Sequence, residues 1–133
     1  METLYANHAP HQKLARGKPA WIKINDKGWV SITGGKTELA IVNAKIQVSG
    51  LKDGESAEIG WQLVHFKSGE KTVVRSTRIT MQWTQNGREN DIYIGQIPAS
   101  DRGTGWHIRL RLVAKANAAR AVIDRVQIGG AVF

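Results

Sequence analysis

Hydrophobic and polar residues alternate along most of the chain after Trp21, and this period of two is typical of strands with one buried face. Segment 106–116 shows it most clearly, because its apolar residues share one parity and its basic residues share the other. Turn-forming residues separate such segments, and Asn86-Gly87 is the strongest hairpin signal. The pattern predicts strands at 21–24, 29–32, 38–48, 57–67, 72–85, 91–97, 106–116 and 122–128.

Short strands joined by turns, with no convincing amphipathic helix, favour an all-β fold. We predict an antiparallel β-sandwich of jelly-roll type that covers residues 21–133, with the inner faces of two sheets forming one core. Leu110, which lies between two arginines, is expected in that core. Three tryptophans that share parity with aliphatic neighbours are expected there too: Trp61, Trp83 and Trp106.

Residues 1–20 show neither a helical nor a strand period, and they contain two prolines and scattered basic residues. We therefore predict an extended N-terminal arm outside the sandwich. This arm is expected to be dispensable for folding but needed for assembly, because an ordered arm must find its contacts on a neighbouring subunit. The residues expected to make those contacts are Leu4, Tyr5, Leu14 and Lys18.

The composition fits one globular domain, with 133 residues, of which 41% are hydrophobic and 23% charged. The chain contains no cysteine, which excludes a disulfide scaffold, a thiolate metal site and a thiol nucleophile. No apolar run approaches the ~20 residues that a membrane helix needs, and the first part of the chain has no secretory-signal pattern. We therefore expect neither a membrane span nor secretion.

Basic residues are in excess, with 19 lysines and arginines against 11 acids and a net charge of +8. Alternation places Arg109 and Arg111 on the same side of one strand, ~7 Å apart. Lys115 follows on that strand, and Arg125 lies on the next one. Such a basic stripe fits an acidic protein surface or phosphate groups, and the alternative is an ordinary solvated sheet face.

No arrangement of residues predicts catalysis or metal binding. His8 and His11 have a spacing that can hold a metal ion on a helix, but Pro10 disfavours a helix there. The paired carboxylates fall in turn-rich segments, where they ordinarily serve as solvated caps: Glu55 with Glu58, and Glu89 with Asp91. We therefore expect a protein with no enzymatic activity, no cofactor and no bound metal.

In its order of strands, the chain resembles small jelly-roll domains of bacteriophage structural proteins, such as tail, baseplate and head-fibre modules. The segments that carry this resemblance are 18–24 (KPAWIKI), 105–113 (GWHIRLRLV) and 121–129 (AVIDRVQIG). The resemblance implies a structural or attachment component of a virus particle. It also implies a homo-oligomer that meets other virion proteins and is assembled in the host cytoplasm.

Two other functions remain open. Trp21 and Trp29 flank the first predicted hairpin and are the best candidates for exposed tryptophans, which stack on sugar rings in carbohydrate-binding modules. A sandwich of this kind would bind a host-surface glycan. The second alternative is a basic nucleic-acid-binding sandwich, which rests on charge alone because no nucleic-acid motif is present.

Overall fold

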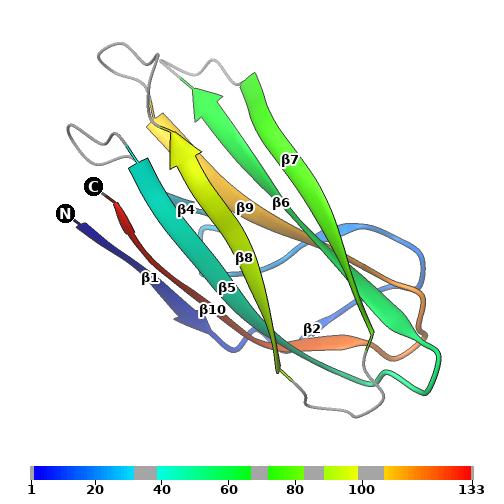
Figure 1. Ribbon diagram of the computed structural model, residues 1–133. Helices are drawn as coiled ribbons and strands as arrows, with labels where there is room; N and C mark the ends of the chain where they lie inside the picture. Colours follow the sequence, from blue (N-terminus) through cyan, green and yellow to red (C-terminus); the bar gives the residue numbers. More distant parts are fainter. Residues whose placement is uncertain (1, 32–38, 67–71, 83–88, 99–106, 133) are drawn as a thin grey trace.

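The computed structural model of the chain is a sandwich of two antiparallel β-sheets (Figure 1). It describes residues 2–31, 39–66, 72–82, 89–98 and 107–132. Sheet A consists of β1 (Glu2–His8), β2 (Gln12–Lys13), β5 (Leu39–Ser49), β8 (Glu89–Pro98) and β10 (Val122–Val132). Sheet B consists of β3 (Ala20–Trp21), β4 (Val30–Ser31), β6 (Ser56–Phe66), β7 (Thr72–Gln82) and β9 (His107–Ala116).

The strand order is that of a jelly roll. Sheet A has the order β1-β10-β5-β8, and sheet B has the order β3-β9-β6-β7. The short strands β2 and β4 extend the two edges, since β2 pairs with β10 and β4 pairs with β9. Among the long strands, only β6 and β7 are neighbours both in sequence and in a sheet, so the chain passes from one sheet to the other after β5, β7, β8 and β9. The predicted antiparallel sandwich is confirmed.

The core consists of alternate residues of the long strands, as the sequence pattern predicts. On β5 the inward residues are all fully buried: Val42, Ala44, Ile46 and Val48. Leu110 and Leu112 of β9 are buried opposite them in sheet B, together with Trp61 of β6. Trp83 and Trp106, also expected in the core, lie outside the described residues.

The N-terminal segment corrects the sequence interpretation. We expected an arm outside the sandwich, but β1 pairs with β10 along its whole length, from Glu2↔Val132 to His8↔Val126. Ala6 of β1 is buried in the core, and so is Leu14, which is only 3% exposed. The physical reason is the jelly-roll topology, in which β10 would otherwise have no neighbour on this side. The segment is therefore part of the sandwich.

The side chain of Gln12 links the N-terminal segment to sheet B by hydrogen bonds. Its side-chain amide donates a hydrogen bond to the carbonyl of Trp21 (2.9 Å), and its side-chain oxygen accepts one from the N–H of Lys23 (2.9 Å). The N–H of Leu14 donates to the carbonyl of Ala121 (3.0 Å), directly before the start of β10. Residues 12–14 thus connect an edge of sheet A to an edge of sheet B. Their hydrogen bonds fix the course of the chain where it enters β3.

Candidate interaction surface

The outer face of sheet B carries the two arginines that the sequence singles out. On β9, Leu110 and Leu112 point into the core, so Arg109 and Arg111 project from the opposite face and are partly exposed. The strands β3 and β4 flank β9 at this edge of the sheet. In the backbone register, Trp21 lies opposite Val113 and Ser31 lies opposite Arg109. The register therefore brings two tryptophans beside two arginines.

Each arginine stacks on one tryptophan. The guanidinium carbon Cζ of Arg109 lies 3.7 Å from the ring centroid of Trp29, and that of Arg111 lies 3.6 Å from the ring centroid of Trp21. The ammonium Nζ of Lys27 lies 5.1 Å from the centroid of Trp29. All three distances are within the ~6 Å range of cation–π attraction. These five residues are referred to below as the Arg–Trp surface.

A tight turn positions Trp29 for this contact. The side-chain oxygen of Asn25 accepts hydrogen bonds from the N–H groups of Lys27 (3.0 Å) and Gly28 (2.8 Å). The side-chain amide of Asn25 donates to the carbonyl of Trp29 (2.9 Å). Gly28 has a φ of 82°, a conformation that costs glycine little and other residues more. The sequence Asn25-Asp26-Lys27-Gly28 therefore folds locally and delivers Lys27 and Trp29 to the edge of sheet B.

The Arg–Trp surface combines fixed geometry with positive charge. A guanidinium that stacks on an indole uses its flat face, and its N–H groups point outward along its edges. Stacking also restricts the rotamers of a long side chain before any partner binds. Partial burial lowers the pKa of Arg111 from its ordinary value, because desolvation disfavours the charged form. The chemistry offered is that of a preorganised receptor for carboxylate or phosphate groups.

Two members of the predicted basic stripe lie apart from this surface. Lys115 is on the same face of β9, but its register partner is Glu58 of β6, so an acid offsets its charge. Arg125 belongs to β10, which is in sheet A, so it does not continue the stripe. The sequence interpretation counted Arg125 in the basic stripe, on the strand that follows in sequence. That expectation is wrong because the chain crosses between sheets after β9.

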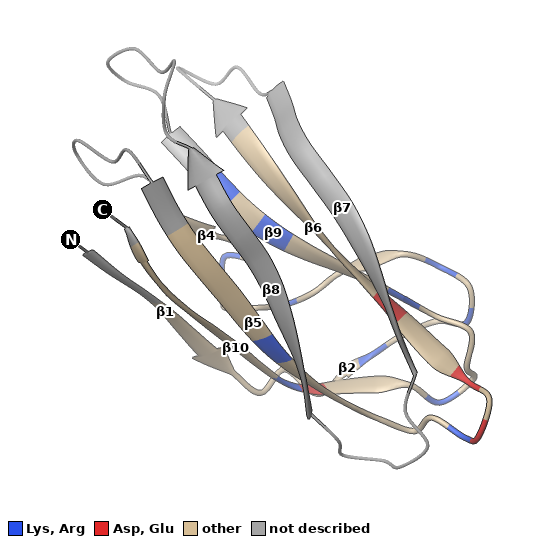
Figure 2. Ribbon diagram, viewed as in Figure 1, with Lys and Arg blue, Asp and Glu red and all other residues tan. Residues whose placement is uncertain are grey.

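Charge is distributed unequally along sheet B (Figure 2). The basic residues Arg109 and Arg111 lie near the start of β9, whereas Glu55 and Glu58 lie near the start of β6. Because β6 and β9 are antiparallel, these two starts are at opposite ends of the sheet. The described part of sheet B therefore carries these two arginines at one end of its strands and these two acids at the other.

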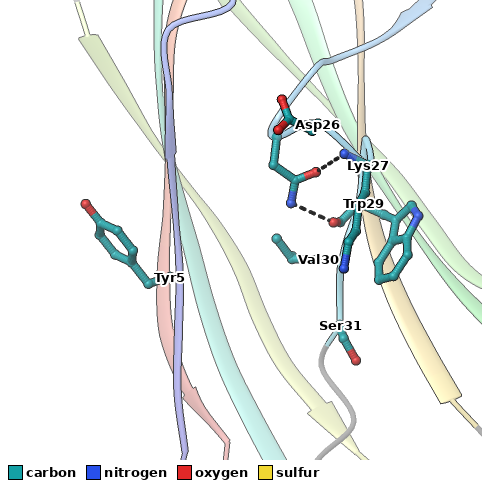
Figure 3. A pocket seen from close by; sticks show the side chains of 7 residues that line it. Tyr5, Asp26, Lys27, Trp29, Val30 and Ser31 are labelled. Atoms are coloured by element: carbon teal, nitrogen blue, oxygen red, sulfur yellow. Dashed lines mark hydrogen bonds between the residues drawn. The ribbon is translucent and has the colours of Figure 1, made fainter.

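A groove lies at the mouth of the sandwich, between β1 of sheet A and the 25–31 segment of sheet B (Figure 3). Its volume is about 400 Å³. Figure 3 shows Val30 pointing into the gap between the sheets, while Tyr5 and Trp29 point away from each other on the two outer faces. Tyr5 of β1 lines one side of the groove, so the two sheets are not closed at this edge.

The four residues expected to contact a neighbour from the arm lie in different settings. Tyr5 is 70% exposed on β1, and Lys18 is exposed before β3. Leu14 is buried within its own chain, so it is wrong as a contact residue. The backbone of Leu4 is in β1, and its side chain lies outside the described residues. The sequence interpretation did not include Lys27 and Asn25 among the candidate site residues, although Asn25-Asp26-Lys27-Gly28 has the composition of a turn.

The described residues contain no group of three or more histidine, cysteine or acidic side chains that could hold a metal ion. They also contain no helix of the length and apolarity required to cross a membrane.

Comparisons with known proteins yield structural likeness only. No protein-family model matches the chain, and no curated protein matches it in sequence. Among solved structures, it is similar to the structure of infectious bursal disease virus Gx strain, with a TM-score of 0.50 and 12% identity. This match covers 98% of the chain and 32% of the other, so the chain spans about a third of that protein.

A second likeness is to dimeric latent PorU from Porphyromonas gingivalis, with a TM-score of 0.38 and 13% identity over 96% of this chain and 12% of that one. At such low identity the viral match supports the fold alone, and it agrees with the jelly-roll order of the strands. The PorU match is too distant to support any argument.

Proposed function

We propose that the chain is a non-catalytic structural subunit of a virus particle, acting by assembly with itself and with other virion proteins. The observation that carries this proposal is the likeness of nearly the whole chain to part of an infectious bursal disease virus structure. Jelly-roll sandwiches are a recurrent architecture of viral capsid domains. A tail, baseplate or head-fibre role within a phage particle is the finer form of the proposal, and it rests on the sequence resemblance.

The Arg–Trp surface is the contact that this function would use. Its positive charge complements an acidic partner surface, and complementary charge sets register and excludes wrong partners. The stacked arginines are already ordered, which lowers the entropy cost of forming an interface. Aromatic and arginine side chains are also the types enriched at interface centres.

Reversal of the two stacked charges tests the proposal. The variant Arg109→Glu with Arg111→Glu is expected to lose higher-order assembly, because a reversed charge repels the complementary partner surface. Assembly is measured by mass photometry and negative-stain electron microscopy of the full chain, alone and mixed with candidate virion proteins. Circular dichroism verifies that the variant remains folded.

A matched control separates the site from the overall charge. Arg16→Glu with Arg120→Glu changes the net charge by the same amount at two exposed positions away from the Arg–Trp surface. This control is expected to assemble as the unaltered chain does. If both variants assemble equally well, Arg109 and Arg111 are not part of the interface, and their charge serves solubility only.

Nucleic-acid binding is a second candidate, favoured by the interleaving of Arg and Trp that the structure contains. Basic residues beside aromatic rings are common in proteins that bind single strands. If this function holds, affinity for any oligonucleotide falls steeply as salt increases and depends little on sequence. Fluorescence anisotropy over a salt series measures this, and Arg109→Glu with Arg111→Glu should weaken binding more than the matched control. Tight binding at physiological salt, lost only in the first variant, would replace the assembly proposal.

The glycan alternative has no comparable support. Trp21 is exposed and Trp29 is half-buried, and a cation lies over each ring, which competes with a sugar for the stacking face.

A further inference from the structure

Strand β1 forms one edge of sheet A, and β8 forms the other. No other strand described in the structure lies on its outer side, and β1 pairs with β10 over all seven residues without a register shift. An edge strand directs alternate N–H and C=O groups outward, which makes it a template for a further strand. Natural sheets usually block such edges with lysine, proline or a bulge, and Glu2–His8 (ETLYANH) contains none of these.

Exposure and shape support pairing at this edge. Tyr5, at the centre of β1, is 70% exposed, more than any other large hydrophobic side chain in the described residues. The groove at the mouth of the sandwich opens beside it. A strand added to β1 would bury part of Tyr5 and line this opening. Both features are confined to one edge of the molecule.

Charge and sequence indicate a second copy of the chain as the occupant. The protein carries a net charge of +8, which opposes contact between most of its surfaces. Strand β1 has no lysine or arginine and one acid, so two copies can approach here without that repulsion. The strand is also self-complementary when it is reversed about its centre, because Glu2 then lies opposite His8 and Thr3 lies opposite Asn7.

We propose that two copies pair antiparallel through β1 about a two-fold axis at Tyr5, which joins their A sheets into one continuous sheet. The two-fold axis places Tyr5 opposite Tyr5 of the partner subunit. It places Glu2 opposite His8 of the partner subunit at both ends of the interface. This inference rests on the proposed assembly function and specifies its first contact. Isologous pairing of this kind is the commonest way to form a homodimer.

Single cysteines test the register, since the chain contains none. In the proposed dimer, the two Tyr5 positions have Cα atoms ~4.5–5.5 Å apart, within the ~4.4–6.8 Å range of disulfides. Tyr5→Cys is therefore expected to form a disulfide-linked dimer under mild oxidation. Asn7→Cys is the matched control, because its two positions are offset by four residues, or ~13 Å along the strands. Linkage is expected to be at least roughly tenfold slower in the control.

A mixing experiment sharpens the test. Thr3→Cys and Asn7→Cys should each link poorly alone but link to each other when mixed, because the two positions are opposite in the proposed register. Size-tagged versions distinguish the mixed dimer from the two homodimers on a non-reducing gel. Sedimentation velocity of the unaltered chain should show a reversible dimer, and circular dichroism should show that each variant is folded.

Two results would overturn the inference. One is a monomer at every concentration that the unaltered chain tolerates. The other is equal linkage of Tyr5→Cys and Asn7→Cys, which would mean another register or random collision. The Arg109→Glu with Arg111→Glu variant keeps the two failures distinct. Loss of higher-order assembly in that variant, with Tyr5→Cys linkage retained, supports both proposals. Higher-order assembly of the unaltered chain without Tyr5→Cys linkage contradicts only the proposed β1 dimer.

Discussion

Deletion of residues 1–14 is expected to abolish the cooperative unfolding transition. The truncation removes β1 and β2 and thus exposes one whole side of β10. It also removes Leu14, which is 3% exposed, and loss of a buried leucine side chain alone costs about 2–5 kcal/mol. A domain of this size is stable by only about 5–15 kcal/mol, so these losses together consume most of it. Thermal unfolding followed by circular dichroism and calorimetry measures the result.

Two single variants show which residues of this segment stabilise the fold. Leu14→Ala should destabilise the fold by about 2–5 kcal/mol, since its side chain is in the core. Tyr5→Ala should change stability by less than about 1 kcal/mol in dilute monomer, because the ring is largely solvated. If the truncated chain unfolds cooperatively with a Tm within a few degrees of that of the full chain, this prediction is wrong. The segment would then be dispensable for folding, as the sequence interpretation expected.

The difference between the expected arm and the observed strand has a physical cause. The period of two is visible only where a strand is long enough to repeat it, as on β5 and β9. Strand β2 has only two residues and shows no period, whereas β3 and β4 overlap the strands that the pattern predicts at 21–24 and 29–32. Strand β1 is longer, but its buried residue Ala6 is small and gives a weak hydrophobic signal. The periodicity argument therefore misses β1 and β2, the two strands of the N-terminal segment.

The candidate site illustrates a second limit. Alternation predicted that Arg109 and Arg111 share a face, and both do project from the outer face of sheet B. Periodicity describes one strand, however, and says nothing about which strand lies beside it. The contacts of Arg109 with Trp29 and of Arg111 with Trp21 join segments about 80 to 90 residues apart in sequence. They depend on the pairing of β3 and β4 with β9, which the topology alone decides.

Topology also explains why Arg125 was misplaced. The sequence interpretation included Arg125 in the basic stripe, and strands that are consecutive in sequence often lie side by side. In this jelly roll, β9 and β10 belong to different sheets, and their outward residues face opposite sides of the molecule. The sequence therefore predicts the class of fold and the inner and outer faces of the long strands. Lateral neighbours, on which a surface site depends, require the strand order.

Leu110→Ala is expected to cost about 2–5 kcal/mol of stability, with a fall in Tm of about 10 °C or more. Leu110 is fully buried at the centre of β9. Its register partners on either side are Val30 of β4 and Leu63 of β6, both buried as well. The truncation would leave a cavity bounded by three strands that their hydrogen-bond ladders hold in place, so little relaxation can fill it. Urea unfolding measures the change.

The same strand supplies the control for this prediction. Lys115→Ala alters an exposed residue of β9 and should change stability by no more than about 0.5 kcal/mol. The contrast between the two variants tests the assignment of inner and outer faces, because both shorten a long side chain on one strand. If Leu110→Ala costs less than about 1 kcal/mol, this face of β9 is in solvent, and the arginines that stack on Trp21 and Trp29 would then belong to the inner face.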